Sequence, residues 1–525
     1  MHADLSRSTF RPGRHYSAVL AQQGRVQLDA DANEQAAIQL HQARTLAADL
    51  IGRHGGPREN AGFHIHFPGG NREIDDLEIH GGRYYVDGIL CDADRPTDGD
   101  AVPDEGDSSD ADGQEGEEGE AGPTVWHYWD QPDAYRDPER PGDRLPTTYP
   151  YVMYLKVWER SVTAVEDPAL REVALGAALV DTAARAKVVW QALPLPASAL
   201  DLDDPEGADP AEVRSAFGKW AREQASTARF AARAQRPEHA DEDPCLVKPD
   251  ARYRGPENQL YRVEIHEGGA AGEATFKWSR ENGSVVFPVE ELDGTWVELA
   301  SLGQDDKLDL DVGDLVEFGD TAYVSRLEPL PLLRVEELDL PGRRVRLSGE
   351  PDARVGRRPE LHPFLRRWDH RGGVRRKGRT AALRGGAVKV EEGTWLPLED
   401  GVEVYFEKGG RYRTGDYWAV AARTATGDVE WPVNAARKPL FARPAGIVRH
   451  YAPLALVKGE QEPVDLRLAF SALATRSIPH ASDAELAAEA RARDEEYAAE
   501  NAAPSGMSRS ETTAAAEAAV DEGGL

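Results

Sequence analysis

Three clusters of residues in this 525-residue sequence have types and spacing that suit binding chemistry. The first is Asp29, Asp31 and Asn33, which place oxygen ligands at alternate positions, as the start of a calcium-binding loop does. The sixth position of such a loop is Glu34 instead of glycine, and the twelfth is Leu40 instead of glutamate. The first turn of a helix, whose positive dipole end favours acidic residues, explains the cluster better than calcium does.

The second cluster is the pair His64-x-His66. Side chains two positions apart on a β-strand face the same side, so the two imidazoles could supply half of a metal site. The neighbouring sequence offers no cysteine, carboxylate or third histidine at ligand spacing. We therefore expect two surface histidines on a strand and assign no metal site.

The third cluster is a basic island that begins at residue 357. Basic and aromatic side chains in alternation can hold single-stranded nucleic acid. The chain carries a formal charge of −31, however, and a field of that sign repels nucleic acid. Contact with an acidic protein surface, or with this chain's own acidic segment, is the preferred interpretation. The island comprises Arg357, Arg358, Arg366, Arg367, Arg371, Arg375, Arg376, Lys377 and Arg379, with Phe364 and Trp368.

The chain has two cysteines, Cys91 and Cys245. Two cysteines in a chain of this length do not make a disulfide framework, which indicates folding in a reducing cytoplasm. They form no CxxC pattern, and the sequence places no base beside either thiol. Buried core thiols are therefore expected in place of a nucleophile.

The remaining motifs indicate structure and not catalysis. Asn282-Gly283-Ser284 fits the glycosylation sequon, but a turn is expected because the first 14 residues lack the apolar core of a secretory signal. The pair Glu166-Asp167 is expected by chance in a chain with 93 acidic residues. Motifs of the GK[ST], HExxH and GxSxG types are absent. We expect no catalytic, cofactor-binding or metal-ligating residues, no cofactor and no enzyme.

The composition indicates a chain that folds around its own cores, with 40% apolar residues and 11 tryptophans. Its length suits about three domains. No stretch approaches the roughly 18 apolar residues that would span a bilayer. We therefore expect cytoplasmic synthesis, and if the protein works outside the cell, it must leave by lysis or inside a particle.

The elements that must position these residues are predicted to be mostly β. A helix is expected at residues 29–51, because apolar residues recur at helical spacing until Gly52. Period-two patterns predict strands at 74–80 and 83–90, joined as a hairpin at Gly81-Gly82.

The middle of the chain combines strands with one inserted helix. Strands are expected at 151–158 and 187–193, and a helix at 209–235 that opens with Asp209 as N-cap and Pro210 in its first turn. Short strands over 259–350, with a tight turn at Asn282-Gly283, indicate a barrel or a sandwich.

Two segments are not expected to build a core. Residues 92–122 hold 13 acidic residues against one arginine, so a disordered loop is predicted. The C-terminal tail, residues 478–525, is rich in alanine and glutamate and has capping-box spacing at Ser482 and Ser508. Helices of that composition are weak alone and are expected to form against a partner.

The predicted fold class is therefore mainly β with minor α, in a multidomain chain of short-strand sandwich or barrel modules. The expected segments are an N-terminal helix with a hairpin (1–91), an acidic loop and linker (92–148), a β segment with an inserted helix (149–250), a barrel- or sandwich-like domain (251–350), the basic island with a C-terminal β domain (351–477), and the helical tail (478–525).

Four segments, which lie within residues 4–457, resemble one family. It is a domain of unknown function encoded among the genes of phage-tail-like and extracellular contractile injection particles. The chain differs from the family pattern at Ala32, where the family has tryptophan, and in its acidic loop and tail. The motifs that carry the resemblance are Gln23-Gly24-Arg25-Val26-Gln27-Leu28-Asp29-Ala30-Asp31, Glu166-Asp167-Pro168, Asn258-Gln259-Leu260-Tyr261-Arg262 and Tyr412-Arg413-Thr414-Gly415-Asp416-Tyr417-Trp418.

The resemblance implies a structural component of a contractile particle: a baseplate-associated, shell or fibre-base subunit. Its partners would be baseplate, sheath or fibre proteins and further copies of itself, with no nucleic acid and no membrane insertion. Two alternatives remain open at this point. A receptor- or glycan-binding module at the particle tip would show an exposed aromatic groove, and an envelope hydrolase would show converging carboxylates in a cleft.

Overall fold

The structure is a computed structural model that describes residues 1–68, 76–96, 125–176, 181–235, 252–303, 307–370, 383–473 and 491, and only the backbone of 375–376 and 379–380. The helices and strands belong to one compact unit, Met1–Phe470. The prediction of a mainly β chain with few helices is confirmed. In the described part, no helix has the length and apolarity needed to cross a membrane.

The α-helices make up a small part of this unit. They are α1 (Asp29–Ile51), α2 (Pro210–Glu223) and α3 (Thr321–Arg326). Single turns of 3₁₀-helix occur at Pro12–Arg14, Pro141–Asp143, Pro168–Leu170, Val173–Leu175, Ala197–Ala199 and Pro359–Leu361.

Four small sheets form around the N-terminal and middle strands. Their strand orders are β30 (Ala469–Phe470), β1 (His54–Pro57), β4 (Arg83–Val86), β5 (Ile89–Asp92); β2 (Ile65–His66), β3 (Glu78–His80), β6 (Val125–His127); β29 (Val464–Asp465), β28 (His450–Val457), β7 (Tyr151–Val162), β8 (Arg185–Pro196); and β23 (Trp395–Pro397), β24 (Val402–Phe406), β9 (Phe230–Ala234).

A six-stranded sheet and a closed barrel make up the rest. The sheet runs β21 (Leu383–Arg384), β22 (Ala387–Lys389), β12 (Thr275–Ser279), β10 (Gln259–Ile265), β26 (Tyr417–Arg423), β27 (Asp428–Glu430). The barrel runs β13 (Val286–Asp293), β14 (Trp296–Leu299), β17 (Arg344–Leu347), β16 (Leu333–Asp339), β15 (Leu315–Gly319), β18 (Phe364–Trp368). Two-stranded pairs join β11 (Gly269–Ala270) to β25 (Arg411–Tyr412), and β19 (Arg375–Arg376) to β20 (Arg379–Thr380).

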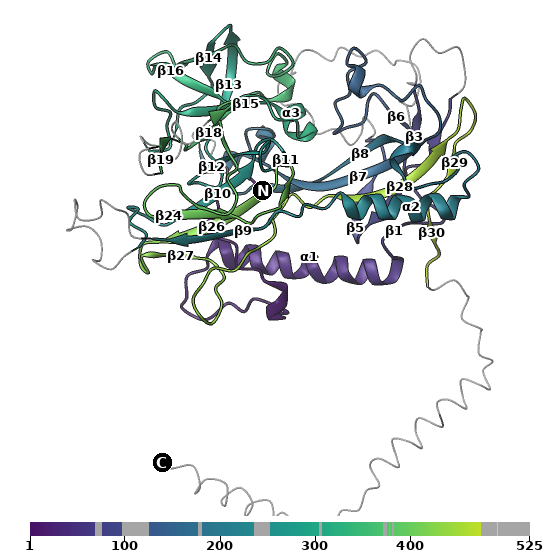
Figure 1. The fold of residues 1–525 in the computed structure, drawn as a ribbon, viewed down its shortest axis with the longest axis horizontal. Coiled ribbons are helices and arrows are strands. Elements are labelled where there is room, and N and C mark those ends of the chain that lie inside the picture. Colours follow the sequence, from purple (N-terminus) through teal and green to yellow (C-terminus); the bar gives the residue numbers. More distant parts are fainter. Residues whose placement is uncertain are drawn as a thin grey trace, which may run out of the picture. The chain divides into compact units, whose positions relative to one another are not determined.

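The six-stranded sheet lies at the centre of this arrangement. Figure 1 shows the barrel and α1 on opposite sides of the unit, with β10, β12 and β26 between them. β10 pairs with β12 on one edge and with β26 on the other, so segments more than 150 residues apart in sequence meet there. Of the range 259–350, for which a barrel or a sandwich was predicted, β13 to β17 do form a barrel, which β18 completes, whereas β10 and β12 belong to the six-stranded sheet.

The predicted N-terminal hairpin is wrong because its two strands pair with other strands. The hairpin expected at Gly81-Gly82 does not form, since β3 pairs with β2 and β6 while β4 pairs with β1 and β5. The hairpin that does form is β4–β5, which turns at Asp87 and Gly88 with positive φ at both residues.

The inserted helix is shorter than predicted. Asp209 caps it by accepting hydrogen bonds from the amides of Ala211 and Glu212, as expected for an N-cap. The helix ends at Glu223, and residues 230–234 become β9, because they complete a sheet with β24. Pairing with a distant strand therefore outweighs the local helix propensity of this alanine-rich stretch.

The prediction of a disordered loop at 92–122 is wrong for its first residues. Of residues 92–122, those from 97 onward lie outside the described residues, but Asp92 ends β5 and Ala93 is fully buried. The indole nitrogens of Trp190 and Trp126 donate to the backbone oxygens of Asp92 and Ala93, both at 3.0 Å. The first residues of the segment therefore belong to the folded unit. The C-terminal helices expected in 478–525 also fall outside the described residues, residue 491 apart.

Two deletions test this boundary. Removing 97–122 should leave the thermal midpoint within about 2 °C of the parent, because the segment has no large apolar residue except Val102 to add to a core. Removing 92–122 should lower the midpoint by more than about 4 °C, because it also removes the buried Ala93 and the two indole hydrogen bonds. Equal thermal midpoints for the two deletions would show that residues 92–96 contribute nothing to the stability of the folded unit.

Candidate functional site

The most unusual chemistry in the described residues is a buried charge cluster between the six-stranded sheet and the barrel. On the sheet, β10 presents Arg262 and Glu264 on one face, and the register places Lys277 of β12 directly opposite Glu264. In the barrel, Glu317 of β15 lies directly opposite Arg366 of β18. All five side chains are at least nine-tenths buried. We call these five residues the charge cluster.

Lys277 joins the two halves of the charge cluster. Its ammonium nitrogen lies 3.3 Å from Glu264 Oε1 and donates to Glu317 Oε1 at 2.7 Å. Arg262 Nε donates to the other oxygen of Glu264 at 2.6 Å. One lysine therefore bridges a carboxylate of the sheet and a carboxylate of the barrel.

Aromatic residues complete the surroundings of Glu317. The Tyr323 hydroxyl, from α3, donates to Oε1 at 2.8 Å, and the Trp368 indole donates to Oε2 at 3.1 Å. The Lys277 ammonium also lies 4.3 Å from the centroid of the Trp368 ring. Such charge-assisted and cation–π contacts offset part of the cost of removing the charges from water.

Both carboxyl groups of the cluster stay ionised. Burial alone would raise the pKa of Glu264, but the Arg262 guanidinium, together with His2 and Lys277, holds that pKa well below its ordinary value. Burial would likewise raise the pKa of Glu317, but Lys277 and Arg366 lower it to about 2. Neither carboxyl group can therefore supply a proton as a general acid near neutral pH, which is the role an envelope hydrolase would require of one of them.

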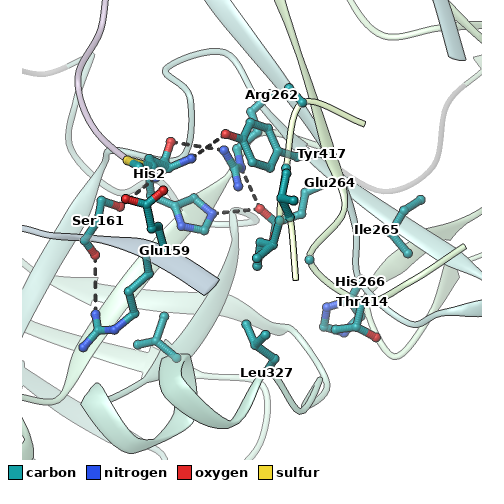
Figure 2. Close-up of a pocket in the computed structure, with 18 of the residues that line it drawn as sticks. His2, Glu159, Ser161, Arg262, Glu264, Ile265, His266, Leu327, Thr414 and Tyr417 are labelled. Carbon is teal, nitrogen blue, oxygen red and sulfur yellow. Dashed lines mark hydrogen bonds and ion pairs between the residues drawn. The ribbon is translucent and has the colours of Figure 1, made fainter. Parts of the chain in front are cut away.

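Residues 1–3 extend into the cluster from the side. His2 Nε2 lies 2.8 Å from Glu264 Oε2, and burial lowers the pKa of His2 well below its ordinary value, so the neutral ring donates this hydrogen bond. The backbone oxygen of Met1 accepts hydrogen bonds from Arg262 and from Asn282. Figure 2 shows His2, Arg262 and Glu264 joined by these interactions, with Tyr417 above them.

A cavity of about 330 Å³ opens beside the cluster. The cluster residues line one part of it, and partly exposed residues such as Glu328 connect it with solvent. Figure 2 shows His266 and Thr414 on one side of the cavity, apart from the His2–Glu264 contacts. The apolar part of the lining consists of Ile89, Val324, Leu327, Pro329, Ile447 and Val448.

The residues singled out in the sequence lie elsewhere. Asp29 and Asp31 belong to the first turn of α1, where Asp29 accepts hydrogen bonds from Ser6 and Asp31 accepts one from the Leu28 amide. The helix-terminus interpretation of this motif is confirmed. The described residues contain no group of His, Cys, Asp and Glu side chains arranged to hold a metal ion.

His64 and His66 meet partners that the sequence did not reveal. His80, from β3, brings its ring to 5.4 Å from that of His64 and 5.9 Å from that of His66. Glu462 lies 2.8 Å from His66 Nδ1 and 3.9 Å from His64 Nε2. The two histidines do face the same side, as predicted, and the same glutamate lies beside both of them, but the group has no metal geometry.

Cys91 is a buried core thiol, as predicted. Its side chain is fully buried in the core around β4 and β7, and burial raises the pKa of the thiol to about 12. A thiol with that pKa is a poor nucleophile at neutral pH. Cys245 lies outside the described residues.

The basic island is not the continuous surface that its sequence suggested. Arg366 and Arg367 are buried on β18, because that strand closes the barrel and packs against the six-stranded sheet. Arg357 and Arg358 are paired with acidic neighbours, Glu350 and Glu360. The side chains of Arg371, Arg375, Arg376, Lys377 and Arg379 lie outside the described residues.

The two remaining motifs have structural roles. Asn282 is buried and donates to the backbone oxygens of Met1 and Ala3, so it forms the expected turn and holds the N-terminal residues. Glu166 pairs with Arg160 at 2.6 Å, and Asp167 caps a short 3₁₀ turn.

Sequence reasoning missed the charge cluster because its residues look like the solvent face of a strand. Arg262 and Glu264 on β10, and His266 directly after it, alternate with apolar residues, a pattern typical of a half-exposed strand. In the fold every residue of β10 is buried. One signal in the sequence could have revealed the cluster. The neighbouring strand β12 also places a charged residue, Lys277, between apolar residues.

The fold defines a mainly β protein in which charged side chains are buried between a sheet and a barrel. The chain belongs to a family of unknown function (DUF6519), whose model matches residues 1–131, 145–204 and 208–524. No curated protein and no solved structure matches the chain. The relation to contractile particles drawn from the sequence stays a prediction.

Replacing one buried carboxylate tests the charge cluster. Glu317→Gln should lower the free energy of unfolding by about 3–5 kcal/mol, because it leaves Lys277 and Arg366 short of a counter-charge in the interior. The control is Glu337→Gln, whose half-exposed carboxylate pairs with Arg346 and whose loss should cost less than about 1 kcal/mol. Denaturant unfolding measures both, and similar losses for the two variants would contradict the structural role of the cluster.

His266 should make stability depend on pH. Burial, with Lys277 nearby, lowers the pKa of His266 to about 3, against 6.5 for an ordinary histidine. As the pH falls below 6.5, the unfolded chain takes up a proton that the folded chain does not, so stability present above pH 6.5 is lost progressively between about 6.5 and 3.

The His266→Asn variant lacks this proton uptake. As the pH falls from 6.5 to 5, the free energy of unfolding of this variant should decrease by about 2 kcal/mol less than that of the parent. The exposed His15 has the left-handed backbone that asparagine tolerates, so His15→Asn is the matched control. Parallel pH profiles for the parent and His266→Asn would show that His266 is not held neutral.

Proposed function

We propose that this protein is a structural subunit of a contractile, phage-tail-like injection particle, in which it acts through protein–protein contacts. The observation that carries the proposal is an exposed apolar surface on α1 and on the segment that precedes it. The four sequence segments that resemble a family encoded with such particles support it independently.

α1 buries one side and exposes apolar residues on the other. Ala30 and Ile38 are buried against the unit, while Leu46 and Leu50 are 61% and 64% exposed. Six exposed residues at intervals of three or four lie along the side opposite Ala30 and form a continuous stripe, because that spacing returns to one helix face. We call this stripe the outer face of α1: Ala32, Ala36, Leu40, Ala43, Leu46 and Leu50.

The segment before α1 adds to this surface. Residues 15–28 run out and back around a turn at Gly24, and all of them except Val19 are exposed. Leu20 and Val26 are 82% and 83% exposed, and Tyr16 and Leu28 are also exposed. Figure 1 shows this segment beyond the end of α1, on the side away from the barrel. Contiguous exposed apolar residues of this kind are typical of protein interaction sites.

The outer face of α1 is complementary to itself. Its first half carries two alanines and one leucine, and its second half carries one alanine and two leucines. In an antiparallel pair of α1 helices related by a two-fold axis, Ala32 comes opposite Leu50, and Ala36 comes opposite Leu46. Leu40 comes opposite Ala43, so each large side chain meets a small one. Such isologous pairing is the commonest way in which identical chains associate.

The charges at the helix ends fit the same pairing. The first turn of α1 is acidic, with Asp29 and Asp31, and Arg53 follows its last turn with a side chain that is 64% exposed. An antiparallel arrangement places Arg53 of one copy at the acidic end of the other. The occupant of the outer face is therefore a second copy of this chain, and the exposed segment 15–28 enlarges the contact toward the roughly 1,200 Å² that stable interfaces bury.

Charge substitutions on α1 test this surface. The parent should self-associate in solution, and the double variant Leu46→Glu with Leu50→Glu should weaken self-association at least about tenfold, because it buries unpaired carboxylates at the contact. The control adds the same charges to exposed positions off the stripe, Gln42→Glu with Thr45→Glu. Light scattering of the purified chains measures the association. A monomeric parent, or equal weakening by both double variants, would contradict pairing through the outer face.

Co-purification tests the particle role directly. The parent should co-purify with assembled sheath and tube, and the double leucine variant should be depleted from those particles while the control is retained. A monomeric parent whose incorporation still depends on Leu46 and Leu50 would identify another subunit as the occupant of the outer face. A parent that never co-purifies with sheath and tube would refute the structural proposal.

A further inference from the structure

The cavity beside the charge cluster is lined by charged side chains that differ in how closely they are paired. The lining is balanced in number, with five cations and five carboxylates: Arg44, Arg160, Arg262, Lys277 and Arg366, and Asp87, Glu159, Glu264, Glu317 and Glu328. His2 and His266, which also line the cavity, are neutral and add no charge. A buried charge without a close partner is costly, so the least closely paired cation is the place where an anion would bind.

Arg366 is the least closely paired cation of the lining. Its guanidinium makes no hydrogen bond to another described residue, and its nearest carboxylate oxygen, Glu317 Oε2, lies 3.8 Å away. That oxygen already accepts a hydrogen bond from Trp368. Arg366 Nε is buried without a partner, and the side chain faces the cavity. A planar guanidinium with free donors is the group that proteins use to hold a carboxylate.

His266 is a second unpartnered group in the cavity. Only 2% of its surface is exposed, and Figure 2 draws no hydrogen bond or ion pair from its ring to the other lining residues shown. Figure 2 shows the ring beside Thr414, apart from the contacts between His2, Arg262 and Glu264. A neutral imidazole can donate one hydrogen bond and accept another, so it can orient a polar atom of a ligand.

The rest of the lining is suited to an apolar body. Ile89, Val324 and Leu327 face the cavity, together with Ile447 and Val448. The volume of about 330 Å³ is at the lower end of the range for small-molecule sites, which typically combine apolar walls with a few polar groups.

We propose that this cavity binds a small monocarboxylate with an apolar body, whose carboxylate pairs with Arg366 and whose chain lies against the apolar lining. A single carboxylate supplies the close partner that Arg366 lacks. Inorganic phosphate has no apolar body to lie against the lining, and a cationic ligand would be repelled by Arg366. The site does not depend on the assembly surface, because α1's outer face contributes no residue to the lining.

Binding to the parent protein gives the first test. Octanoate should bind saturably by titration calorimetry and raise the thermal midpoint. Octanol, which has the same body without the charge, should bind roughly tenfold or more weakly, because it lacks the charge-assisted hydrogen bonds to Arg366. Inorganic phosphate should not compete with octanoate. Equal binding of octanol and octanoate, displacement by phosphate, or no saturable octanoate binding would each overturn the proposal.

Substitutions locate the carboxylate. Arg366→Met should lose octanoate affinity by roughly tenfold or more while its affinity for octanol stays within about twofold of the parent. The matched control is Arg346→Met, an exposed arginine of the barrel outside the cavity, which should bind octanoate as the parent does. Unchanged octanoate binding by Arg366→Met would refute the assignment of the carboxylate.

A second variant keeps the test valid if Arg366→Met does not fold. His266→Leu enlarges the apolar lining and removes a hydrogen-bonding ring, so it should weaken octanoate more than octanol. If His266→Leu binds both octanoate and octanol as tightly as the parent does, the ligand does not occupy this cavity and the proposal fails.

Discussion

The fold depends on one constraint: charges that lie between the six-stranded sheet and the barrel must be paired away from water. Lys277 meets this constraint by bridging Glu264 of the sheet and Glu317 of the barrel. If the two modules moved apart by a few ångströms, each of these charges would lose its partner in a poorly solvated interior. The pairing therefore fixes the position of the sheet against the barrel, which apolar contacts alone would leave less specific.

The same constraint accounts for the surroundings of the cluster. Residues 1–3 are drawn into the interior because His2 and the Met1 carbonyl satisfy donors and acceptors that the cluster leaves open. Tyr323 and Trp368 are directed inward because Glu317 needs donors on both oxygens. A cavity remains beside the cluster, and the incompletely paired Arg366 gives it the character of a binding site. The assembly surface on α1 is made of different residues and faces solvent.

Local features of the fold could be predicted from the sequence. The bounds of α1, the Asp209 cap of α2 and the long strands β7 and β8 follow from helical spacing, cap chemistry and runs of strand-forming residues, which act over a few neighbouring positions. The buried state of Cys91 also followed from its chemistry. Strand pairing did not follow. The turn at Asn282-Gly283 forms with positive φ at both residues, yet β12 and β13 on its two sides join the sheet and the barrel separately.

The sequence by itself determined a mainly β chain, an acidic surface charge and the positions of its helix starts, because these depend on composition and on residues close together along the chain. Only the tertiary structure decided that the charged side of β10 is buried, that Arg366 faces a cavity and that His80 and Glu462 join His64 and His66. An alternating strand has the same pattern whether water or a second sheet covers its polar side. Which of the two covers it depends on contacts between residues far apart in sequence, such as Glu264 with Lys277 and Lys277 with Glu317.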